Sequence, residues 1–217
     1  QVPLLGSVSA TKISSEGVTD DVAASAISDN NNLITSNIYA ARSVLRDLGA
    51  IDPMELGRVL GNSVAQAFDL DVLAALADLN GNGGTVTLGV DDLFDAAGAI
   101  RAAGEFGQLY GVISVAAATA LMKSIGTSSY AGGAFQTAAL TNGFVGQVAG
   151  INLFQSAYVT GAHGYVFGTD AARIAMFRGV DIEVQRRASA VGNDIVASLM
   201  AGVGVVDANR GIKLALD

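Results

Sequence analysis

One run of about 26 residues predicts a single long amphipathic helix, and this helix constrains the fold more than any other feature. The run opens with Asp52, which suits the N-cap, Pro53, which suits the first helical position, and Glu55, three residues after the cap. Apolar residues then recur every fourth position on one face: Leu56, Leu60, Val64, Phe68, Val72 and Leu76. We expect a helix over 53–78, roughly 39 Å long, that serves as a spine against which a sheet packs.

The rest of the chain mixes strand-like and helical segments, so the sequence predicts an α+β fold without internal repeats. Residues 1–50 are expected to be extended, with a turn between two strands at 29–32 and with the best strand candidates at 33–35 and 38–40. The predicted shorter helices cover 90–103 and 116–125, with a helical piece at 135–140. Further strands are expected at 110–115, within 144–159, and at 181–187, 194–200 and 202–207, while 171–177 is a short apolar segment and 211–216 closes the chain.

Composition excludes several classes of protein. Among 217 residues, 51% are hydrophobic and only 15% are charged, which is the opposite of a disordered chain. The absence of cysteine excludes a disulfide scaffold and any thiolate metal site. Because 20 acidic residues outnumber 12 basic ones, a protein whose main affinity comes from neutralising phosphates is disfavoured.

The high apolar content raises the question of a membrane. The longest stretch without charge, 124–169, is interrupted by glycine and polar residues, and the best apolar run, 112–122, is too short to span a bilayer. We expect no membrane partner and no signal peptide, and a chain that starts at Gln1 because it was processed or truncated. The apolar excess then indicates surface that becomes buried against partners.

No catalytic site emerges from the motifs. His163 is the single histidine, and both a Gly-x-Ser-x-Gly elbow and a Gly-Lys-Ser/Thr phosphate loop are absent. We therefore interpret His163 as a loop residue at a surface or interface, and predict that the protein is not an enzyme and that it has no catalytic residues.

Two motifs resemble ligand loops, and both are incomplete. Residues 78–83 match the first half of a calcium loop, but Gly89 stands where the bidentate glutamate belongs. The favoured interpretation is a helix end closed by Asn and Gly in left-handed conformations. Residues 202–207 begin like a dinucleotide fingerprint, but Asp207 replaces the third glycine within strand-like sequence. The sequence predicts neither a metal nor a cofactor.

The only concentration of basic residues lies in the last third of the chain. Because no aromatic residues are interleaved with them, a nucleic-acid surface is the weaker interpretation. We expect Arg186 and Arg187 to pair with acids such as Glu183 or with a neighbouring subunit. The basic residues are Arg173, Arg178, Arg186, Arg187, Arg210 and Lys213.

The order of several short motifs resembles the major capsid proteins of tailed bacteriophages, which share the Hong Kong 97-type fold. The matching segments extend over nearly the whole chain, at 2–6, 16–17, 38–40, 68–73, 143–151, 182–189 and 202–207. The resemblance implies a P-domain, with the spine helix and a narrow sheet, from residues 1–80 and 168–200. It implies a compact α/β A-domain from 81–167 and 201–217. Gln1 falls close to the descending strand of the family's E-loop, so this region is expected to be truncated.

The resemblance also implies a function. Family members self-assemble as hexamers and pentamers of an icosahedral head around double-stranded DNA, without catalytic residues or cofactors. The expected partner is the chain itself, with decoration or scaffold proteins and a weak, non-specific contact to DNA, in a virion assembled in the host cytoplasm. An encapsulin-like shell of the same fold, enclosing cargo proteins, is the alternative, and an α+β enzyme of unrecognised type is the third.

Overall fold

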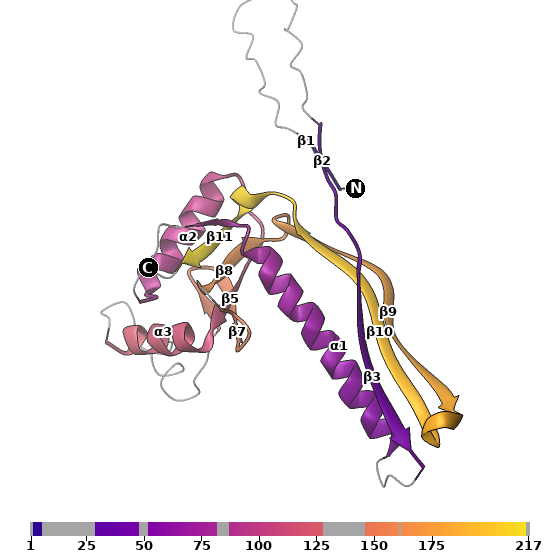
Figure 1. The fold of residues 1–217 in the computed structure, drawn as a ribbon. Helices are drawn as coiled ribbons and strands as arrows, with labels where there is room; N and C mark the ends of the chain where they lie inside the picture. The colour runs from indigo at the N-terminus through magenta and orange to yellow at the C-terminus, as the bar shows by residue number, and fades with distance from the viewer. Residues whose placement is uncertain are drawn as a thin grey trace, which may run out of the picture.

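The computed structural model describes residues 2–5, 29–47, 52–81, 87–127, 146–160 and 162–215. The described elements form two lobes, one elongated and one compact, in which helices and sheets are mixed (Figure 1). The predicted α+β class is therefore confirmed. The helical piece predicted at 135–140 lies outside the described residues.

The elongated lobe consists of a long helix, α1 (Pro53–Leu76), on a three-stranded antiparallel sheet (Figure 1). The strand order is β3 (Asn37–Arg46), β10 (Gly192–Val205), β9 (Ala172–Arg187). The apolar stripe of α1 packs against the central strand, where Leu60 and Val64 meet Ile195, Ala197 and Leu199 in one buried cluster. The predicted spine helix on a sheet is confirmed.

The ends of α1 follow from local sequence. Asp52 accepts a hydrogen bond from the Met54 N–H at 3.0 Å, as predicted for the N-cap. The helix ends at Leu76, two residues before the predicted end at 78. Three successive N–H groups, from Ala77 onwards, bond to carbonyls three residues back, so the last turn tightens without a left-handed residue. The predicted left-handed closure at Asn80-Gly81 is wrong, because both residues form strand β4 (Asn80–Gly81).

By length and composition alone, Met54–Leu76 is apolar enough to span a membrane. In the structure its apolar stripe packs instead on the three-stranded sheet.

The compact lobe is built, among the described residues, on a six-stranded sheet in the order β4–β11–β8–β5–β7–β6. The helices α2 (Val90–Ala102) and α3 (Val115–Thr127) pack on it and share its main core, with Leu93, Ile100 and Ile113 fully buried (Figure 1). The other strands are β5 (Leu109–Ser114), β6 (Gln147–Val148), β7 (Ile151–Ser156), β8 (Ala162–Gly168) and β11 (Gly211–Ala215).

Several strands differ from the sequence prediction because their partners decide where they end. Residues 171–177 and 181–187 belong to one strand, β9, which continues through an irregular register around Met200 of β10. The predicted strands 194–200 and 202–207 likewise form the single strand β10. A Cβ on Gly202 would lie 2.3 Å from the Thr35 carbonyl oxygen, so glycine lets the segment 33–36 cross β10 closely.

The N-terminal prediction is corrected in two places. The segment 29–32 is not a turn: β2 (Asp29–Asn32) pairs antiparallel with β1 (Val2–Leu5). Residues 33–35 are not a strand, because the next strand begins at Asn37. The predicted strand at 38–40 is confirmed as part of β3.

A third, smaller apolar cluster lies where the two lobes join. It gathers Leu76 and Leu79 from the end of α1 with Tyr165 of β8 and Ala171. The chain passes between the lobes three times at this joint: from α1 to β4 through 77–79, from β8 to β9 through 169–171 and from β10 to β11 through 206–210. Among the described residues, the joint therefore combines six buried apolar residues with three short connections.

Candidate interaction surface

The residues considered for catalysis do not assemble into a site. His163 is only 8% exposed and lies inside β8, so its assignment to a surface loop is wrong. The apolar run Tyr165-Val166-Phe167 that follows it was the sequence signal for a buried strand. Its position two strands away from the sheet edge explains the burial.

In the described part of the calcium-loop motif, residues 80 and 81 form strand β4, which pairs with β11. Asn80 pairs with Ile212 of β11, and its side-chain amide donates a hydrogen bond to Asn209 at 3.0 Å. Residues 82 and 83 of the motif lie outside the described residues. Within the described part of the chain, no group of three or more His, Cys, Asp or Glu side chains could hold a metal ion.

The basic residues of the last third of the chain are engaged within the chain. Arg186 forms a two-pronged ion pair with Asp47, both contacts at 2.6 Å, and this hydrogen bonding lowers the pKa of the Asp47 carboxyl. The expected pairing of Arg186 with an acid is confirmed, but the acid is Asp47; Glu183, which the sequence suggested as an example, lies 3.5 Å from Arg178 instead. The other contacts are Arg173–Asp170 at 2.6 Å, Arg178–Asp181, Arg187–Ser189 at 3.2 Å and Arg210 with three carboxylates.

Two polar contacts hold β3 in the elongated lobe. Arg42 of β3 donates to Asp194 of β10 at 2.8 Å through Nε, and this hydrogen bonding lowers the pKa of the Asp194 carboxyl. The Tyr39 hydroxyl donates to Asp71 on α1, and its ring packs edge-on against Phe68 with centroids 5.6 Å apart. Burial, and then the bond to Asp71, raise the pKa of Tyr39.

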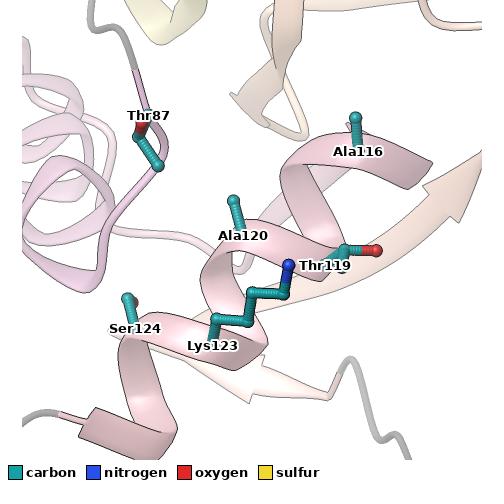
Figure 2. Close-up of a pocket in the computed structure, with 6 residues that line it drawn as sticks. All are labelled: Thr87, Ala116, Thr119, Ala120, Lys123 and Ser124. Atoms are coloured by element: carbon teal, nitrogen blue, oxygen red, sulfur yellow. The ribbon is translucent and has the colours of Figure 1, made fainter.

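A cavity of about 630 Å³ lies along α3 in the compact lobe (Figure 2). Its lining combines alanines and hydroxyl residues with a single charged group: Thr87, Ala116, Thr119, Ala120, Lys123 and Ser124. None of these six residues is an acid, a histidine or a cysteine, so they provide no carboxylate, imidazole or thiolate as a metal ligand.

The most unusual surface of the described chain is strand β9. Six of its large apolar side chains are between 46% and 63% exposed: Ile174, Met176, Phe177, Val180, Ile182 and Val184. We call this set the edge-strand surface. Soluble proteins usually shorten, charge or cover such a strand, because a long apolar edge invites pairing with another chain.

The position of β9 explains why this surface stays open. Among the described strands β9 is the edge of its sheet, so its outer backbone groups have no strand partner there. Ile182 and Val184 stand opposite Ala197 and Ile195 of β10, which places them on the face that carries α1. The helix lies over β10 and β3 and touches β9 only marginally, near Gly57. An apolar strip therefore remains beside the helix.

The sequence predicted apolar surface in excess, but it did not show where this surface lies. The alternation of apolar and charged residues over 181–187 indicates a half-buried strand, but it does not indicate whether another element covers the apolar face.

No family model and no curated protein matches this chain.

Solved structures match the fold over nearly the whole chain. The capsid structure of the cyanophage P-SCSP1u has a TM-score of 0.78 at 19% sequence identity, covering 99% of this chain and 82% of that one. A structure from Mycobacterium phage Che8 has a TM-score of 0.77 at 20% identity, covering 98% and 83%. The capsid of an empty GTA particle has a TM-score of 0.70 at 14% identity, covering 99% and 84%. The chain has the fold of tailed-phage major capsid proteins, as the sequence predicted.

Proposed function

We propose that this chain is a major capsid protein of a tailed bacteriophage, which self-assembles into the closed shell of the phage head. In this role copies of the chain form hexamers and pentamers of an icosahedral shell around double-stranded DNA, and the protein is structural rather than enzymatic. The shell is assembled in the host cytoplasm and becomes part of the virion.

The edge-strand surface is the observation that carries this proposal beyond the fold. A chain that leaves six large apolar side chains open along one 16-residue strand gains stability when another copy covers them. Repeated copies supply such a cover in a shell, because each copy offers the same strand and the same partner surface. The similarity to phage capsid structures over 98–100% of the chain supports this role.

The same proposal assigns the two lobes to the domains of the capsid fold. Residues 1–80 and 168–200 form the P-domain with its spine helix, and residues 81–167 and 201–217 form the A-domain. The separate buried cores of the elongated and compact lobes support a division into two domains. The strand β10 itself continues to Val205 within the elongated lobe.

Contact with packaged DNA is proposed to be weak and non-specific. The chain carries a net charge of −8, and most arginines of its basic cluster already contact acids of the same chain. Decoration or scaffold proteins remain further partners within this proposal.

An encapsulin-like shell with protein cargo is not favoured, because the similar structures described above come from phages and a GTA particle.

Electron microscopy of the purified chain tests the proposal directly. We expect closed shells or ring-shaped capsomers, and particles purified from infected cells should contain nuclease-protected double-stranded DNA. A protein that remains monomeric at high concentration under all assembly conditions contradicts the shell function. Particles that hold protein cargo and no DNA would instead support the encapsulin-like alternative.

A further inference from the structure

Three segments that are distant in sequence meet at the joint between the lobes. They are the loop between α2 and β5, which holds Glu105, the crossing 169–171 and the crossing 206–210. The two crossings are bonded to each other, because the N–H groups of Val206 and Asp207 both donate to the Ala171 carbonyl at 2.8 and 3.2 Å. These two crossings, together with the segment 77–79 that leads from α1 to β4, connect the elongated lobe to the compact lobe.

Glu105 is a buried carboxylate at this joint. Its side chain is only 6% exposed, and its Oε1 accepts the Gly107 N–H at 2.9 Å. Space for it is made by a glycine: a Cβ on Gly168, at the end of β8, would lie 2.5 Å from Glu105 Cγ. Burying a carboxylate without a cationic partner costs free energy, so the burial of Glu105 requires a cation at its other oxygen, Oε2.

The partner of Glu105 is Arg210, which reaches all three segments. Its NH1 group donates to Glu105 Oε2 at 3.1 Å and to Asp170 Oδ2 at 3.3 Å. Its Nε group donates to Asp207 Oδ2 at 3.2 Å. One guanidinium therefore links the compact-lobe loop to both crossings, and this hydrogen bonding, with Glu105 first, raises the pKa of Arg210.

We propose that Glu105, Arg210 and Asp170 form an ionic clasp that holds the two lobes at one angle. Each lobe has its own buried core, so each can stay folded while the joint moves. Short connections outside helices and strands are where domain hinges absorb changes of backbone angle. At this joint the clasp adds fixed hydrogen bonds to a small apolar cluster. Opening it frees the lobe angle without unfolding either lobe.

The lobe angle can be measured directly because the chain contains no cysteine. Spin labels are placed at Gln66→Cys on α1 and Ala99→Cys on α2, two exposed helical positions in different lobes. Labelled chain is diluted with unlabelled chain, so that only distances within one copy are recorded by pulsed electron resonance. Circular dichroism and thermal melting of each sample report whether the lobes are folded.

Arg210→Gln is the main variant, since it removes the cation from all three carboxylates. We expect a distance distribution at least about twofold wider than that of the parent, with helix content unchanged. Asp194→Asn is the matched control, because it breaks the Arg42 ion pair inside the elongated lobe, and it should leave the distribution narrow. A lower melting temperature with an unchanged distance distribution overturns the proposal, because it would show that these ion pairs stabilise the fold without fixing the angle between the lobes.

A second variant decides the matter should Arg210→Gln fail to fold. Asp170→Asn combined with Asp207→Asn removes both arms to the crossings and keeps Glu105 paired with Arg210. We expect a distribution wider than that of the control, and an unchanged one overturns the proposal. These distances are independent of shell formation, so electron microscopy of the unlabelled samples tests the proposed function separately.

Discussion

Replacing Val180 and Val184 by threonine tests whether copies of the chain cover the edge-strand surface. Threonine keeps the β-branched shape that suits a strand, while a hydroxyl replaces one methyl group. The two valines are 52% and 63% exposed. Since full burial of such a side chain contributes about 1.5–3 kcal/mol, covering the exposed parts contributes about 1.7–3.5 kcal/mol for the pair. Threonine keeps one methyl group of each valine, so we expect the loss of about half of this contribution, about 0.9–1.7 kcal/mol, or a roughly 4- to 18-fold weaker association per contact.

The assay is the concentration at which shells or capsomers first form, followed by light scattering and checked by electron microscopy. Thermal melting of the unassembled variant must match the parent, because the substituted groups face solvent in the single chain. Val59→Thr combined with Val115→Thr is the control, with valines 48% and 44% exposed outside the edge-strand surface. Assembly of the β9 variant at the parent concentration would refute the reasoning that this strand is buried between copies.

Three further predictions concern the elongated lobe. Ile195→Ala should lower the free energy of unfolding by about 2–5 kcal/mol in urea titrations, because Ile195 is buried under α1, and a loss well below this range contradicts that packing. The raised pKa of Tyr39 means that the free energy of unfolding falls as the pH rises above about 10, because the unfolded chain loses the hydroxyl proton first. Melting curves of Tyr39→Phe should lack the part of the stability loss at alkaline pH that comes from this hydroxyl. The lowered pKa of Asp194 means that the free energy of unfolding falls as the pH drops below about 3.8. Melting curves of Asp194→Asn should therefore show a smaller loss of stability at acid pH, whereas an unchanged loss would show that the Arg42–Asp194 pair does not stabilise the fold.

Local features of the fold were predictable because nearby residues encode them. The N-cap at Asp52, Pro53 in the first turn and an apolar residue at every fourth position specify α1 without reference to the rest of the chain. The helices α2 and α3 were likewise predicted within two residues at each end. The resemblance of the ordered motifs to phage capsid proteins also predicted the fold of the whole chain.

The strands and the candidate sites depended on contacts between distant residues. β9 and β10 are each continuous across the gaps that the sequence prediction left at 178–180 and 201, because the two strands pair with each other along their length. The partner of Arg186 is Asp47, which lies 139 residues earlier, and the partner of Glu105 is 105 residues away. No pattern of spacing along the chain indicates such pairs.

The sequence by itself determined that the chain has a spine helix, a mixed α+β fold, no recognisable catalytic motif and more apolar residues than its interior needs. Only the tertiary structure decided where that excess lies, because an alternating strand exposes or buries its second face according to which elements cover it. Here α1 covers β10 and β3 and leaves β9 open. The tertiary structure also decided that Arg210 meets three carboxylates at the joint between the lobes, since three segments had to fold together before these carboxylates could come close.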